Sequence, residues 1–116
     1  METADAVTIL SALGQPTRLD TFRLLVRTGT QGMAASDIAG EMGVPRNTMS
    51  AHLSILARAG LVESERAGTR IFYRPSFRRL AGLTSFLMEG CCGGREELCE
   101  PMLTEITTLR SKQVER

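Results

Sequence analysis

The apolar residues of this 116-residue chain change their spacing at Gly60. Before Gly60 they recur every three or four positions, which is the period of an α-helix with one buried face. After Gly60, the stretches LVESER and TRIFYRP alternate apolar and polar residues, as half-buried β-strands do. Only Ala67 and Gly68 separate these two stretches, which favours a β-hairpin. The chain is therefore predicted to be mainly α-helical with one small β-hairpin, an α+β fold.

Proline and glycine mark the ends of the predicted helices, since proline fits the first helical turn and glycine commonly follows the last. Four helices are expected before the hairpin, within DAVTILSAL, PTRLDTFRLLVRTG, ASDIAGEMGV and PRNTMSAHLSILARAG. Two more are expected after it, one within SFRRLAGLTSFLMEG and one that starts at Pro101. The predicted order of elements is α-α-α-α-β-β-α-α.

Length and composition exclude several classes of protein. A chain of 116 residues forms one domain with a modest core. No apolar run approaches the eighteen residues of a membrane helix, and METADAVTIL lacks the pattern of a secretory signal, so we expect a cytoplasmic protein without a membrane partner. Residues 31–80 carry seven arginines against four acidic residues, which favours a surface that faces phosphates.

The fourth predicted helix has two different faces. Met49, Leu53 and Leu56 form an apolar stripe, and short polar or small side chains form the opposite one. Short donors and acceptors allow a helix backbone to approach base edges in the major groove. The turn MGV separates this helix from the third, which is the layout of a helix-turn-helix that binds double-stranded DNA. The exposed stripe consists of Asn47, Ser50, Ala51, Ser54 and Arg58, and Arg46 precedes it.

The predicted hairpin carries three arginines, Arg66, Arg70 and Arg74, with Tyr73 between the last two. Cations on a hairpin beside a helix-turn-helix are typical of a wing that lies along the phosphate backbone. The alternative is a solvated hairpin whose arginines pair with Glu63 and Glu65.

Two stretches resemble those of a known family of bacterial sensors. VPRNTMSAHLSILARAGLVESERAGTRIFYRPS is similar to the winged helix-turn-helix core of the arsenic-repressor (ArsR/SmtB) family. LGQPTRLDTFRLL resembles the helix that precedes this core in the family. The resemblance covers roughly residues 6 to 88. It implies a homodimeric repressor that binds an imperfectly palindromic operator and releases it when an effector binds.

The resemblance also assigns parts of the chain and individual residues. It implies one winged helix-turn-helix domain over 1–116, with a reader at 34–60, a wing at 61–75, and dimerisation and sensor helices at 1–14 and 76–116. Arg70 and Tyr73 would serve the wing. The residues expected to face bases or phosphates are Arg46, Asn47, Thr48, Ser50, Ala51 and Ser54.

All three cysteines lie within nine positions, in EGCCGGREELCEP. Cys91, Cys92 and Cys99 lack the fourth ligand of a structural zinc site, but three thiolates suit a soft three-coordinate ion. Gly90, Gly93 and Gly94 let an irregular backbone bring the thiols together. The motif resembles the C-terminal cysteine site of arsenic-responsive family members. We therefore expect As(III) as the effector, or Sb(III), with no organic cofactor.

Other interpretations of the three thiols remain open. The same cysteines would serve a thiol-redox or persulfide sensor if two of them oxidise to a disulfide. They would alternatively pack as small apolar residues. An enzyme with a nucleophilic thiol is not expected, because no histidine or lysine lies near and the flanking Glu96, Glu97 and Glu100 disfavour a thiolate.

Overall fold

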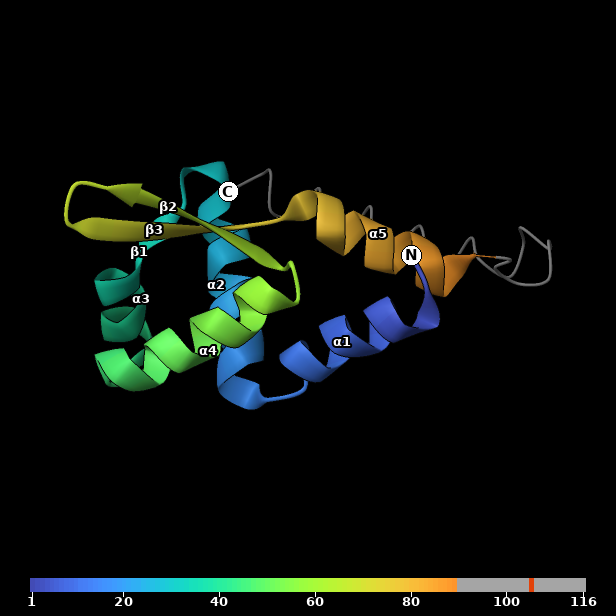
Figure 1. Ribbon diagram of the computed structural model, residues 1–116, viewed down its shortest axis with the longest axis horizontal. Helices are drawn as coiled ribbons and strands as arrows, with labels where there is room; N and C mark the ends of the chain where they lie inside the picture. Colours follow the sequence, from blue (N-terminus) through green and yellow to red (C-terminus); the bar gives the residue numbers. More distant parts are fainter. Residues whose placement is uncertain (90–104, 106–116) are drawn as a thin grey trace. The chain divides into compact units, whose positions relative to one another are not determined.

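The computed structural model describes residues 1–89 and Glu105. Figure 1 shows a helical part followed by a β-hairpin and a further helix, so the five predicted helices and the hairpin before residue 89 are confirmed in their order. The final helix predicted from Pro101 lies outside the described residues. The elements are α1 (Thr3–Leu13), α2 (Pro16–Thr28), the 3₁₀ turn η1 (Gly29–Gln31), β1 (Met33–Ala34), α3 (Ala35–Met42), α4 (Arg46–Arg58), β2 (Val62–Ala67), β3 (Arg70–Pro75) and α5 (Phe77–Met88).

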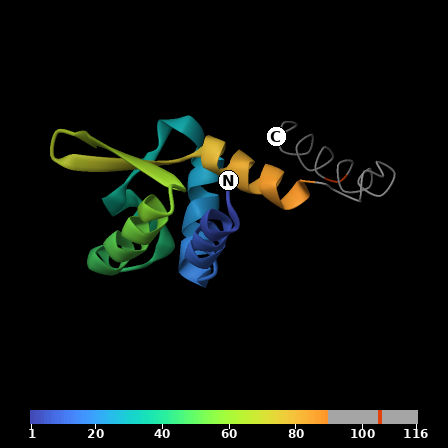
Figure 2. The same ribbon diagram turned by 45° about the vertical axis from the view of Figure 1, so that its right-hand side comes forward.

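The sheet contains one strand that the sequence analysis did not predict. β1 pairs antiparallel with β3, so the sheet has the order β1-β3-β2. Gly32 precedes β1 with φ +75°, and a Cβ atom at this position would lie 2.7 Å from the carbonyl oxygen of Tyr73. A glycine is therefore required for the chain to enter the sheet beside β3. β1 places the start of α3 next to the hairpin, as Figure 2 shows.

The core lies where α1, α2, α3 and α4 meet the first residues of β2. Its largest side chains are at most 1% exposed: Ile9, Leu25, Ile38, Met49, Leu53, Leu56 and Leu61. Thr21 is buried among them, and its hydroxyl donates to the sulfur of Met49 at 3.8 Å. Residues from α1, α2, α3 and α4 thus share one core, which fixes these four helices relative to one another.

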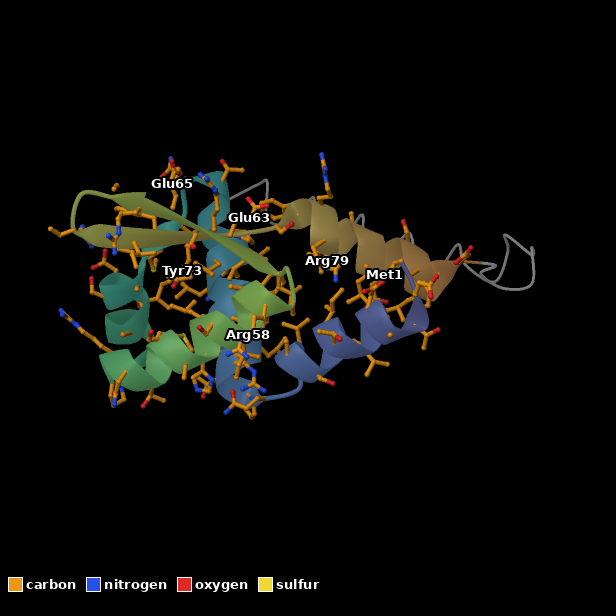
Figure 3. The ribbon with its side chains drawn as sticks, viewed as in Figure 1. Met1, Arg58, Glu63, Glu65, Tyr73 and Arg79 are labelled. Carbon is orange, nitrogen blue, oxygen red and sulfur yellow. The ribbon has the colours of Figure 1, made fainter. Side chains whose placement is uncertain are left out.

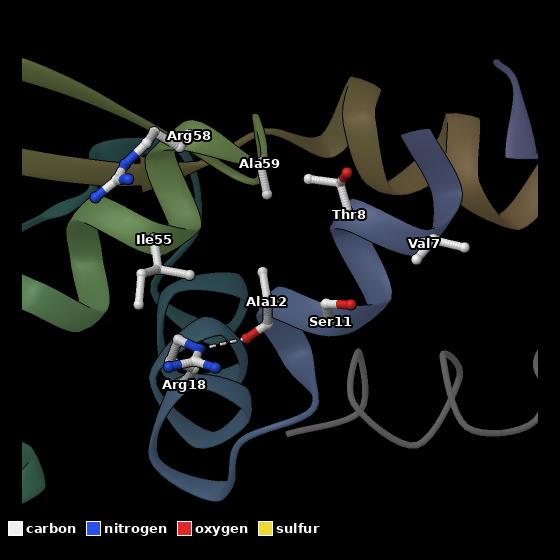
Figure 4. Close-up of a pocket in the computed structure, with 8 residues that line it drawn as sticks. All are labelled: Val7, Thr8, Ser11, Ala12, Arg18, Ile55, Arg58 and Ala59. Atoms are coloured by element: carbon white, nitrogen blue, oxygen red, sulfur yellow. Dashed lines mark hydrogen bonds between the residues drawn. The ribbon is translucent and has the colours of Figure 1, made fainter. Parts of the chain in front are cut away.

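Two arginines bind carbonyl groups at helix ends. The Nε of Arg18 donates to the carbonyl of Ala12 at 2.6 Å, near the end of α1 (Figure 4). The Nε of Arg79 on α5 donates to the carbonyl of Ala59 at 3.1 Å, directly after α4 (Figure 3). Such carbonyls lack partners within their own helix, so these bonds attach α1 to α2 and α4 to α5.

Among the described residues, no helix is long and apolar enough to cross a membrane.

The buried side of α4 provides a test of the fold. Leu53→Ala removes a side chain that is 0% exposed and is expected to lower the free energy of unfolding by about 2–5 kcal/mol. Ser54→Ala changes the next residue, which is exposed, and is expected to change it by less than about 0.5 kcal/mol. Urea unfolding at one fixed protein concentration measures both. Equal effects of the two substitutions would contradict the assigned faces of α4.

Candidate nucleic-acid interface

The structure exposes the predicted stripe of α4. Every residue that was expected to face DNA from this helix is exposed, whereas Met49, Leu53 and Leu56 on the opposite side are at most 1% exposed. The exposed residues are Arg46, Asn47, Thr48, Ser50, Ala51 and Ser54. The contact of each residue with DNA stays a prediction, but the exposed face of α4 that carries these residues is confirmed.

The turn between α3 and α4 sets the direction in which α4 leaves α3. Gly43 ends α3 in the left-handed conformation, with φ +65°. The backbone N–H of Val44 then donates to the carbonyl of Ala39 at 3.0 Å, closing the helix end as a Schellman-type cap does. Val44 also packs against the core. The predicted helix-turn-helix is therefore present, and its turn is held by backbone hydrogen bonds and by apolar contact.

The first turn of α4 combines a cation with the positive end of a helix dipole. Pro45 precedes the helix at its N-cap position, and its side chain forms no capping hydrogen bond. The carbonyl oxygen of the Asn47 side chain accepts from the backbone N–H of Thr48 at 3.0 Å. Arg46 is exposed at this same end. The positive end of a helix dipole beside an arginine favours a phosphate group.

Arg70, which was expected to serve the wing, lies at the turn end of the hairpin. It begins β3 directly after Gly68 and Thr69, which connect the two long strands. One terminal nitrogen of its guanidinium lies 2.6 Å from the Oδ2 atom of Asp37 on α3. The guanidinium carbon also lies over the ring of Phe72, 5.4 Å from the ring centre. Arg70 is thus held at the surface by contacts on two sides.

Tyr73 and Arg74 lie nearer the helices than Arg70 does. Tyr73 is half-buried in the middle strand, opposite Met33 and Ser64, and packs against the core (Figure 3). Arg74 forms an ion pair of 2.8 Å with Glu65. The alternative of charge pairs within the hairpin therefore holds for Arg74. Arg70 instead pairs with Asp37 on α3, outside the hairpin.

A hollow of about 370 Å³ lies between the reader and the wing. Three segments that are distant in the sequence line it: the start of α3, the first turns of α4, and the beginning of β3. We call it the wing pocket, and its lining residues are Ala34, Ala35, Ser36, Arg46, Ser50, Thr69, Arg70 and Ile71. It brings together Arg46, Ser50 and Arg70 from the predicted set. Ser36, which lines it, and Asp37, which pairs with Arg70, were not predicted, because the segments that they meet lie far along the chain.

A second hollow, of about 400 Å³, lies between α1 and α4 and is drawn in Figure 4. Its lining includes Val7, Ile55 and Arg58, and of these only Arg58 belongs to the predicted exposed stripe of α4.

The three predicted metalloid ligands are not among the residues that the structure describes. Cys91, Cys92 and Cys99 lie outside the described residues. Within residues 1–89 and at Glu105, no group of three histidine, cysteine, aspartate or glutamate side chains is arranged to hold a metal ion.

Comparison with known proteins shows which family this chain belongs to. A family model described as a helix-turn-helix domain matches residues 13–65, which include α2, α3 and α4. An uncharacterised helix-turn-helix transcriptional regulator of Methanocaldococcus jannaschii is 41% identical over 68 residues, which are 59% of this chain and 74% of that protein.

Solved structures share the fold over more of the chain. An ArsR-like transcriptional regulator from Rhodococcus sp. RHA1 is 25% identical, with a TM-score of 0.65 over 93% of this chain and 92% of the other. A homodimeric winged helix-turn-helix DNA-binding domain from Mycobacterium bovis, a possible ArsR-family regulator, is 32% identical, with a TM-score of 0.60 over 77% and 82%. The chain therefore belongs to the helix-turn-helix transcriptional regulators, and it is of the winged, ArsR type.

Proposed function

We propose that this regulator is a repressor that binds double-stranded operator DNA through α4 and the wing. The observation that carries the proposal is the exposed face of α4, where short polar side chains lie beside Arg46 and Arg70. Helix α4 enters the major groove with this face, and the wing lies along the neighbouring phosphates. Bound at a promoter, the protein blocks transcription.

The repressor works as a homodimer. Helix α1 exposes Val7 and Leu10, which are 55% and 46% exposed, and Phe77 at the start of α5 is 42% exposed. Exposed apolar side chains on neighbouring helices are typical of an interface. A second copy of this chain is the occupant we propose, in keeping with the homodimeric relative from Mycobacterium bovis. Two copies related by a two-fold axis would hold two α4 helices about 34 Å apart, one turn of duplex.

The effector is trivalent arsenic or antimony, bound by Cys91, Cys92 and Cys99. Arsenous acid exchanges its three hydroxyl groups for three thiols, so that three As–S bonds form and three water molecules leave. Thiolates favour soft ions, which selects these elements over magnesium or calcium. The cysteines follow α5 closely in the sequence, so ion binding there acts on the proposed dimer helices. A coupling of about 1–3 kcal/mol would weaken operator binding by roughly 5- to 150-fold.

A charge placed on the exposed face of α4 tests the DNA proposal. Ser50→Glu brings a carboxylate toward bases and phosphates and is expected to weaken binding by about tenfold or more, equal to the loss of one specific contact. Arg23→Glu on α2 changes the charge by more, but outside the reader and the wing, and is expected to cost less than about threefold. Fluorescence anisotropy with an operator selected from a random duplex library measures both. Equal losses would contradict the assignment of α4.

An arginine on α1 tests the dimer. Val7→Arg is expected to convert the dimer to a monomer, because the interface would bury a charge without a partner. Ile71→Arg makes the same change at another exposed apolar residue, in the wing, and is expected to leave the dimer intact. Light scattering after size-exclusion chromatography measures the mass. A wild type that is monomeric at micromolar concentration would overturn the dimer proposal.

Arsenite titration of the protein–operator complex tests the effector. Under reducing conditions, arsenite is expected to weaken operator binding by the wild type by roughly 5- to 150-fold. The variants Cys91→Ser, Cys92→Ser and Cys99→Ser are each expected to bind the operator normally but to stay bound when arsenite is added. Release by a mild oxidant such as diamide, with no response to arsenite, would replace the metalloid proposal by thiol-redox sensing. A gel shift with a labelled operator records either result.

A further inference from the structure

An acidic residue lies beside the surface that we assign to DNA. Asp37 is in the first turn of α3, and its carboxylate contacts Arg70 at 2.6 Å. The two side chains are 61% and 50% exposed, so water screens the pair and it adds little to the stability of the fold. A carboxylate near the phosphate backbone also repels DNA. The role that remains for Asp37 is its contact with Arg70.

Arg70 is orientated by its surroundings before any DNA arrives. Asp37 engages one terminal nitrogen, and the ring of Phe72 lies beneath the guanidinium at 5.4 Å. Phe72 is itself held by the pairing of β3 with β1, opposite Ala34. A guanidinium carries five N–H donors, so most remain available after Asp37 has accepted one. An arginine side chain fixed in this way loses less conformational freedom when it binds a phosphate.

The wing pocket is lined by a second arginine besides Arg70. Arg46 comes from the first turn of α4 and Arg70 from the start of β3, and both line the same hollow of about 370 Å³. Ser50 adds a hydroxyl on the α4 side. Two arginines and a serine thus line one open hollow, and their side chains supply N–H and O–H donors that suit an anion with several acceptor oxygens.

We propose that the wing pocket binds one phosphate of the DNA backbone, shared by Arg46 and Arg70, and that Asp37 is the positioning residue of Arg70. This inference rests on the proposed function, because it names the group of the DNA that this part of the interface takes. It also joins the reader and the wing into one binding surface, since Asp37 belongs to α3 and Arg70 to β3.

The protein offers a matched control for Asp37. Glu65 and Arg74 form an ion pair of the same kind, at 2.8 Å, with the carboxylate 62% exposed. Neither residue lines the wing pocket. Asp37→Asn and Glu65→Gln each remove one negative charge and one exposed ion pair from the same part of the molecule. Only the first removes the group that orientates Arg70.

Whether Asp37→Asn weakens or tightens DNA binding tests the positioning role of Asp37. Asp37→Asn is expected to weaken binding of a selected operator by about two- to fivefold, although it removes a charge that repels DNA. Glu65→Gln is expected to leave binding unchanged or to tighten it. In an Arg70→Gln background, Asp37→Asn is expected to lose its weakening effect. Tighter binding by the Asp37→Asn single variant would overturn the inference.

The salt dependence of binding tests the shared phosphate. A 30-base-pair duplex of random sequence serves as the probe, because phosphate contacts do not require an operator. Each neutralised phosphate contributes about 0.9 to the slope of log K against log salt. If Arg46 and Arg70 share one phosphate, the double variant Arg46→Gln/Arg70→Gln lowers the slope by about 0.9. A reduction near 1.8 would mean two separate phosphates and would overturn the shared site.

Failure of the proposed function and failure of this inference give different experimental results. A wild type that binds no duplex even at low salt overturns the proposed function and this inference with it. If the wild type binds duplex in a salt-dependent way, but the Arg46 and Arg70 substitutions each lower the salt slope separately, only the inference is overturned. Thermal unfolding of each variant gives the check that it is folded, since all four substituted side chains are exposed or half-buried.

Discussion

The burial of Met49, Leu53 and Leu56 decides which side of α4 remains free. These three side chains lie in a core shared with α1, α2 and α3, so α4 cannot rotate about its axis without exposing them. Each such side chain contributes roughly 1.5–3 kcal/mol when it leaves water. The same constraint that stabilises the fold therefore presents Asn47, Ser54 and their neighbours on the opposite side.

The wing depends on a smaller constraint, the two-residue strand β1. Its pairing with β3 brings the start of α3 against the hairpin, and this contact places Asp37 within reach of Arg70. The wing is consequently fastened to the reader at its turn end by an ion pair and nearer the core by Tyr73. The surface assigned to DNA is thus built from three segments, and their alignment comes from packing and strand pairing rather than from the exposed ion pair alone.

The helices and the hairpin were predictable because their signals are local. The two faces of α4 repeat within thirteen residues, and the alternation after Gly60 marks β2 and β3 directly. β1 was missed because two residues are too few to show an alternation. The pairing of Asp37 with Arg70 spans 33 positions, and no local pattern reports a contact at that distance. Tyr73 lies in the predicted wing, in β3, and it packs against the core, which its local sequence did not indicate.

The central claim is that α4 and the wing turn form one DNA-binding surface. The most direct measurement is an NMR titration of ¹⁵N-labelled protein with a selected operator duplex, which follows the backbone amide of each residue. The account predicts that the largest shift changes fall on Arg46–Ser54 and on Thr69 and Arg70 together, with the exposed face of α2 little changed. Changes confined to α1 and α2, or to α4 without the wing turn, would contradict it.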